Sequence, residues 1–258
     1  MEQKVDIAQT LGWYIDAGID TICGDSCCLK VSQKTPEAVN VVPNNTRPAV
    51  TTLSQAPTQA CKNARDVCQK ANTLSELKSI VENFEGCGLK STAKSTVFGC
   101  GNENASVMLI GEAPGSDEDR MGLPFVGKSG HLLDKMLLSI GINREDVFIT
   151  NVLPWRPPGN RTPTDAEIAV CIPFLRRQIE LIKPKAILLL GGTAANAVLD
   201  NKDSISLMRG RWLEYDLSIS EKIPALATFH PAYLLRNCAQ KAKAWSDFLR
   251  LLKKLKEN

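Results

Sequence analysis

Short apolar runs alternate with longer amphipathic stretches from about residue 85 to the end of the chain. Strands are expected at the short runs, which are Val107–Ile110, Val147–Asn151, Ala186–Leu190 and Ala225–Thr228. The amphipathic stretches predict helices over 129–140, 164–182, 193–200 and 241–255. Strands that alternate with helices indicate a parallel sheet with helices on both faces. The predicted fold class is therefore α/β, a three-layer α/β/α sandwich around a mostly parallel, four-stranded central sheet.

Residues 1–60 show a different pattern. Apolar side chains recur at helical spacing within residues 1–30, whereas residues 31–60 carry four prolines among serine, threonine, asparagine and glutamine. These features predict an N-terminal helix followed by a flexible linker. The main domain is expected over 61–258, and it would begin with a helix over 61–84.

Composition limits the classes of protein that need to be considered. The chain has 258 residues, 43% of them hydrophobic, and a net charge of +3, so binding to nucleic acid would depend on local rather than overall charge. No apolar stretch reaches the roughly 18 residues needed to span a membrane, and no secretory signal is recognisable. A cytoplasmic protein is expected. Its odd number of cysteines, nine, favours metal binding or packing over a disulfide framework.

Four loops follow the predicted strands, at 111–127, 151–163, 191–193 and 229–237. The carboxyl ends of parallel strands meet at one edge of a sheet, which is where open α/β sheets bind their ligands. The loops carry glycines, carboxylates, an amide, arginines and a histidine. The chemistry of the protein is expected at this edge.

The loop 111–127 offers backbone and carboxylate groups to a ligand. Gly111, Gly115, Gly122 and Gly127 would let the backbone approach a ligand closely. The segment with Gly111, Ala113, Pro114 and Gly115 is expected to bind the substrate, in part through backbone N–H groups. Glu112 and Glu118 supply carboxylates, and Phe125 could present an aromatic face. A solvated acidic turn is the alternative interpretation.

The other two chemically rich loops suit a nucleic acid. Asn151 ends a predicted strand, and its amide can both donate and accept hydrogen bonds to a base. Arg156 and Arg161 suit phosphates, although they could equally be solvated in a rigid turn. His230 ends another strand, and it is followed by Tyr233, Leu234, Leu235 and Arg236. That last group predicts either the first turn of an amphipathic helix or an apolar wedge for a DNA stack with an arginine for phosphate.

Taken together, these loops resemble the family 4 uracil-DNA glycosylases. The resemblance covers about residues 84–252 and rests on four segments in the family's order: GEAPGSDEDRMGLPFVGKSGHLLDKML, NVLPWRPPGNRTP, PKAILLLGGTAA and FHPAYLLR. It implies an enzyme that flips uracil out of single- or double-stranded DNA and hydrolyses its N-glycosidic bond. The abasic site that remains would initiate base excision repair. A monomer is expected.

The resemblance also implies roles for individual residues. Glu112 would position or activate water with help from Glu118, and Phe125 would stack on the flipped uracil. Asn151 would bind the Watson–Crick edge of the base, and His230 would stabilise the charge that develops on a uracil oxygen. Leu234 and Leu235 lie in the segment that matches the loop inserted into the duplex.

The family usually holds an iron–sulfur cluster on four cysteines, and this sequence departs from that pattern. Two of the four positions are Phe84 and Trp155, so only Cys87 and Cys171 remain. Two thiolates do not complete the ligation. No cofactor and no metal site are therefore expected, unless the N-terminal cysteines Cys23, Cys27 and Cys28 reach into the site.

Two alternative functions stay open at this stage. The chain could bind damaged or abasic DNA with little catalysis, or it could remove other deaminated bases such as hypoxanthine. The extension 1–60 lies outside the resemblance and could bind a repair or replication protein.

Overall fold

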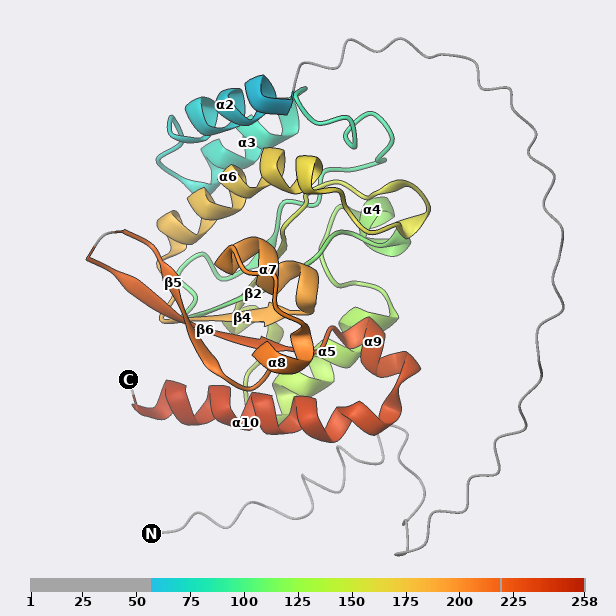
Figure 1. Cartoon of the computed structure of the whole chain (residues 1–258), viewed down its shortest axis with the longest axis vertical. Helices are drawn as coiled ribbons and strands as arrows, with labels where there is room; N and C mark the ends of the chain where they lie inside the picture. The colour runs from blue at the N-terminus through green and yellow to red at the C-terminus, as the bar shows by residue number, and fades with distance from the viewer. Residues whose placement is uncertain (1–56, 219, 258) are drawn as a thin grey trace, which may run out of the picture.

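A computed structural model describes residues 57–218 and 220–257 (Figure 1). The predicted N-terminal helix over 1–30 and most of the predicted linker lie outside the described residues. Helix α2 begins at Pro57, within the stretch assigned to the linker, and it opens the part of the chain that the structure describes.

The central sheet has six strands in the order β1-β3-β2-β4-β6-β5. The four inner strands pair in parallel and correspond to the predicted ones: β2 (Val107–Gly111), β3 (Phe148–Asn151), β4 (Ala186–Leu190) and β6 (Lys222–Thr228). The expectation of four strands was wrong because the sheet also has two antiparallel edges, β1 (Cys100–Gly101) and β5 (Trp212–Asp216). Strand β1 is too short to show a period. Strand β5 carries charged residues and only one buried side chain, so neither edge has the apolar run of an inner strand.

Helices cover both faces of the sheet (Figure 1). Met108 and Ile110 of β2 pack in one buried cluster, and Val107 and Leu109 pack in another, because successive side chains of a strand point to opposite faces. The first face is covered by α2 (Pro57–Cys68), α3 (Leu74–Asn83), α6 (Asp165–Ile182) and α7 (Gly192–Leu199). The second is covered by α5 (Lys128–Ser139) and α10 (Lys241–Glu257).

The single helix predicted over 61–84 is two helices, α2 and α3, with a break before Thr73. The hydroxyl of Thr73 accepts a hydrogen bond from the Glu76 amide at 3.2 Å, and the Glu76 carboxylate accepts from the Asn72 amide at 2.7 Å. These bonds satisfy donors that a helix N-terminus leaves unpaired, so a new helix begins here. A capping box of Thr164 and Glu167 likewise starts α6, at the beginning of the helix predicted over 164–182.

Short helices shape the loops at the carboxyl edge of the sheet. After β2 comes α4 (Ser116–Met121), after β3 comes η2 (Pro158–Asn160), and after β6 comes α9 (Pro231–Arg236). The remaining short elements are η1 (Arg144–Asp146), α8 (Ile205–Met208) and η3 (Cys238–Gln240). None of the helices within 57–218 and 220–257 has the length and apolar character to cross a membrane.

Candidate active site

A cavity of about 360 Å³ opens at the carboxyl edge of the parallel strands. This volume falls within the range of small-molecule pockets. The predicted residues that line it are Glu112, Ala113, Pro114, Gly115, Glu118, Phe125, Asn151, Arg161, His230, Tyr233 and Arg236. The lining also includes Ser129, Pro157, Asn160 and Ala232, which the sequence analysis did not single out. All four belong to segments that carry the family resemblance, and that was the only signal that could have indicated them.

Phe125 is held in a restrained position on the cavity wall. It is buried and has a φ of 53°, in the left-handed region that a phenylalanine rarely adopts. The next two amides, of Val126 and Gly127, donate to Oε1 of Glu118 at 3.0 and 2.9 Å. Gly130 packs against the Phe125 backbone so closely that a Cβ there would overlap the Phe125 carbonyl. These contacts fix the ring as a flat face of the cavity.

Glu118 is therefore engaged in the structure of the loop. The segment 116–121 forms α4 and buries Glu118 and Asp119, so the alternative of a solvated acidic turn was wrong. Asp119 accepts from the Lys94 amide at 2.8 Å and ties α4 to the preceding loop. One Glu118 oxygen orders the backbone that follows Phe125.

Asn151 ends β3 and is buried beside the ring of Phe125. Its Oδ1 has no hydrogen-bond partner within the described residues, although nearly all buried polar atoms in proteins have one. Gly111 is paired with Asn151 across the sheet, and a Cβ on Gly111 would collide with both Asn151 Oδ1 and the Phe125 ring. Gly111 thus lies behind the lining and lets the amide and the ring come together. An unpaired buried acceptor at a cavity wall indicates a position for a ligand donor.

His230 caps the N-terminus of α9 and faces the same cavity. Its Nδ1 accepts a hydrogen bond from the Ala232 amide at 3.1 Å. Burial, with a smaller contribution from the charge of Arg236, lowers the pKa of His230 to about 4, and the charge of Glu118 opposes this shift. The ring is therefore neutral near pH 7. Because Nδ1 accepts, the ring hydrogen is on Nε2.

The Gly191 loop and Phe125 complete the surroundings of the histidine. The ring centroids of Phe125 and His230 are 5.6 Å apart, with a tilt of 30°. Gly191 has a φ of 99°, and a Cβ on it would lie 3.1 Å from the His230 Cβ. The loop after β4, expected at 191–193, thus contributes by close backbone packing against His230.

Glu112 contributes the second carboxylate of the lining. It directly follows β2 and is half-buried, and its carbonyl accepts from the Leu153 amide at 3.1 Å. This bond joins the loops that follow β2 and β3. Glu112 and Asn151 therefore belong to two segments that are held together by their backbones.

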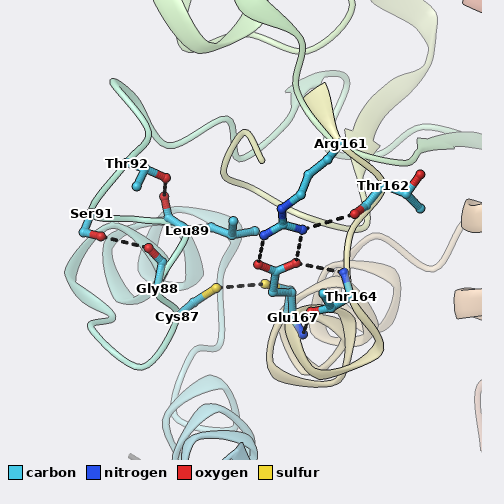
Figure 2. A network of polar contacts seen from close by, with 10 residues as sticks. Cys87, Gly88, Leu89, Ser91, Thr92, Arg161, Thr162, Thr164 and Glu167 are labelled. Atoms are coloured by element: carbon cyan, nitrogen blue, oxygen red, sulfur yellow. Dashed lines mark hydrogen bonds and ion pairs between the residues drawn. The ribbon is translucent and has the colours of Figure 1, made fainter. Parts of the chain in front are cut away.

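Two of the arginines predicted to bind phosphate, Arg156 and Arg161, differ in their surroundings. Arg161 lines the cavity and makes a two-bond ion pair with Glu167, at 2.9 and 2.6 Å, and it also donates to the Thr162 carbonyl (Figure 2). Chiefly through this contact, the pKa of Glu167 falls to about 2. Arg156 lies outside the lining, where it donates to Asn160 at 2.7 Å. The charge of Arg161 is thus largely compensated within the protein.

Leu234 and Leu235 point in different directions from α9. Leu234 is completely buried in the core, so it cannot enter a DNA duplex, and the prediction of a wedge was wrong for this residue. Leu235 is 43% exposed. Adjacent helical residues differ by about 100° in direction, which separates the two side chains. The alternative of an amphipathic helical turn was correct for this segment.

Only two of the four positions that would hold an iron–sulfur cluster carry a cysteine, Cys87 and Cys171. Phe84 packs edge-on against Phe174 with centroids 5.0 Å apart, and buried Trp155 donates from Nε1 to Thr96 at 3.0 Å. Across residues 57–218 and 220–257, no group of three or more His, Cys, Asp or Glu side chains is placed to hold a metal ion. In the part of the chain that the structure describes, the residues at these positions do not fit a four-cysteine cluster.

Comparison with known proteins identifies the class that this fold and site define. Residues 98–249 match the model of the uracil DNA glycosylase superfamily. A type-4 uracil-DNA glycosylase of Archaeoglobus fulgidus is 40% identical over 183 residues, which are 69% of this chain and 92% of that protein. One from Thermotoga maritima is 46% identical over 158 residues, 61% of this chain and 80% of that protein. The chain belongs to the uracil-DNA glycosylase superfamily and, within it, to the type-4 family.

Proposed function

We propose that this protein removes uracil from DNA by hydrolysing the N-glycosidic bond, which leaves an abasic site. The observation that carries the proposal is the unpaired, buried Oδ1 of Asn151 beside the ring of Phe125 and the neutral ring of His230. Membership of a family whose named relatives are uracil-DNA glycosylases supports it.

Uracil is recognised by the amide of Asn151 and the ring of Phe125. The free Oδ1 accepts the N3–H of uracil and the amide nitrogen donates to O4. Cytosine has the opposite arrangement of donor and acceptor at these two ring positions. A site built around a specific hydrogen-bond pattern rejects bases that leave its buried groups unpaired. Stacking on Phe125 fixes the plane of the flipped base.

Groups of the protein stabilise both the uracil and the sugar as the bond between them breaks. The bond to the sugar breaks with negative charge on uracil and positive charge on the sugar. The Nε2–H of neutral His230 donates to the uracil oxygen, and a donor fixed in advance lowers the barrier because it needs no reorganisation. The Glu112 carboxylate orients the attacking water and stabilises the cationic sugar.

Flipping the nucleotide requires contacts outside the cavity. Extrusion of a base costs a few kcal/mol. Exposed Leu235 enters the space that the base vacates, and Tyr233, Arg236, Arg156 and Arg161 lie close to the backbone of the strand. The compensation of Arg161 by Glu167 makes its contribution smaller than that of Arg236.

We further propose that the reaction needs no cofactor, since Phe84 and Trp155 occupy two cluster positions. A monomeric catalytic domain in the cytoplasm begins at α2, four residues before the expected boundary at 61, and the residues before it are an extension that binds a repair or replication protein. The change in composition near residue 60 supports this division.

The decisive experiment uses the purified chain with EDTA and a labelled oligonucleotide that carries one uracil, followed by alkaline cleavage. Strand breakage at the uracil is expected, with none at cytosine or thymine in matched oligonucleotides. Tight binding of abasic DNA by folded protein without any breakage would overturn the proposal and favour a binding protein. Breakage at hypoxanthine alone would show that Asn151 recognises a different base.

A further inference from the structure

The side chains of Cys87 and Cys171 meet at the interface between the turn after α3 and helix α6. The two sulfur atoms are 4.0 Å apart, and the thiol of Cys171 donates to Sγ of Cys87. Both cysteines are buried, and neither lines the cavity. Figure 2 shows the Cys87 sulfur pointing toward α6, near the turn that carries Glu167. The pair thus joins segments that are 84 residues apart in the chain.

We propose that Cys87 and Cys171 form a reversible disulfide, which is a modification site specific to this cluster-free arrangement. The bond would tie the turn after α3 to α6, which are two of the segments in which the family places cluster ligands. The inference does not depend on the reaction in the cavity.

The geometry needs only a small movement. An S–S bond is about 2.05 Å long, so the sulfurs must approach by roughly 2 Å. Cys87 belongs to a compact turn in which the Lys90 amide donates to the Cys87 carbonyl at 3.1 Å. In the same turn, the Ser91 hydroxyl donates to the Gly88 carbonyl at 2.9 Å (Figure 2). Both bonds lie within the turn, and neither involves a sulfur atom.

The two thiols are also chemically unequal. The hydrogen bond from Cys171, assisted by the amides of Leu89 and Lys90, lowers the pKa of Cys87, although burial opposes the shift. The same contact, together with burial, raises the pKa of Cys171. Cys87 is thus the more readily ionised of the two thiols and is the one that attacks first, while Cys171 resolves the intermediate.

Hydrogen peroxide is an oxidant small enough for this site. Phe84, Glu85 and Gly86, which directly precede Cys87, line a surface groove of about 510 Å³. The Cys87 thiolate attacks one peroxide oxygen, the O–O bond breaks, and hydroxide leaves while a sulfenic acid forms. The Cys171 sulfur then attacks the Cys87 sulfur, the S–O bond breaks, and water leaves. In total, two thiols lose two electrons and two protons, and one peroxide becomes two waters.

Oxidation is expected to stabilise the fold more than it changes the cavity. A crosslink across a long loop restricts the unfolded chain. The melting temperature should therefore rise by several degrees, while the rate of uracil removal stays within about twofold because no cavity residue moves with the turn. The pair would replace the permanent cluster of the family with a crosslink that responds to oxidants.

The test uses the full chain, reduced and then exposed to a slight molar excess of hydrogen peroxide. Non-reducing digestion and mass spectrometry should find a peptide pair that joins Cys87 to Cys171, and dithiothreitol should release it. The rise in melting temperature should be absent in Cys87→Ser and Cys171→Ser and retained in Cys238→Ser, the matched control at an exposed cysteine. Cys171→Ala serves if the serine variant does not fold, and the peptide analysis of the unaltered chain needs no variant.

Two results would overturn the proposal. In the first, Cys87 and Cys171 stay as free thiols while Cys238 is oxidised under the same conditions. In the second, iron and inorganic sulfide accompany the purified chain in stoichiometric amounts and are lost on alkylation of Cys87. The thiols would then be cluster ligands, with further ligands supplied from elsewhere.

Discussion

The amide of Ala232 donates a hydrogen bond to Nδ1 of His230 at 3.1 Å, and this one contact fixes both the tautomer of the ring and the start of α9. Protonation of Nδ1 would place two donors face to face and break the cap. The low pKa of His230 is therefore coupled to the stability of the helix that carries Leu235 and Arg236.

This coupling predicts how stability depends on pH. The pKa of His230 is about 4 in the folded protein and near 6.5 when unfolded, so between these values the unfolded chain binds more protons. The free energy of unfolding should therefore increase as pH rises across that window, by at most about 3 kcal/mol. This stabilisation should be lost again as pH falls through the same window. Urea unfolding at pH 4.5 and pH 7.5 measures the change. His230→Asn should show a smaller pH dependence, and an equal slope in both proteins would contradict the assignment.

Two substitutions of Glu118 distinguish a role in holding Phe125 in place from a direct role of its carboxylate in catalysis. Glu118→Gln keeps an oxygen for the amides of Val126 and Gly127, whereas Glu118→Ala does not. If the residue acts by holding Phe125, kcat should fall less than tenfold in the glutamine variant and about a hundredfold or more in the alanine variant, since each lost bond from a charged acceptor is worth about 1.5–3 kcal/mol. Single-turnover cleavage of a uracil oligonucleotide distinguishes them. An equal, large loss in both variants would show that the carboxylate charge itself is required.

Replacing Asn151 should lower the activity of the protein and leave its stability nearly unchanged. Its Oδ1 has no partner among the described residues, so Asn151→Ala removes little that holds the fold together. The lost hydrogen bonds to uracil should lower kcat/KM by about ten- to a hundredfold, or 1–3 kcal/mol. Thermal unfolding provides the control. A large drop in melting temperature with unchanged activity would contradict the proposed contact with the base.

The adjacent leucines of α9 should give opposite results. Leu234→Ala removes a fully buried side chain and should cost about 2–5 kcal/mol of stability. Leu235→Ala should leave stability nearly unchanged and slow the removal of uracil from duplex DNA more than from single strands, which need no wedge. Parallel assays on duplex and single-stranded DNA measure how much the substitution slows uracil removal from each. Equal slowing on both would place Leu235 outside the duplex.

The sequence by itself determined the parallel core and the side of the sheet on which the site lies. Apolar runs that alternate with amphipathic helices require strands in one direction, and the loops after those strands then converge at one edge. That reasoning places Glu112, Phe125, Asn151 and His230 together, and in the structure all four line one cavity.

Only the tertiary structure decided what each group is free to do. The partners of Glu118 and Arg161, the tautomer of His230 and the burial of Leu234 depend on which surfaces pack together. The edge strands β1 and β5 likewise exist because a neighbouring strand offers hydrogen bonds, and their own patterns carry no strong signal. Periodicity records how a segment is buried, whereas the hydrogen bonds that tune a site are made with residues far away in the chain.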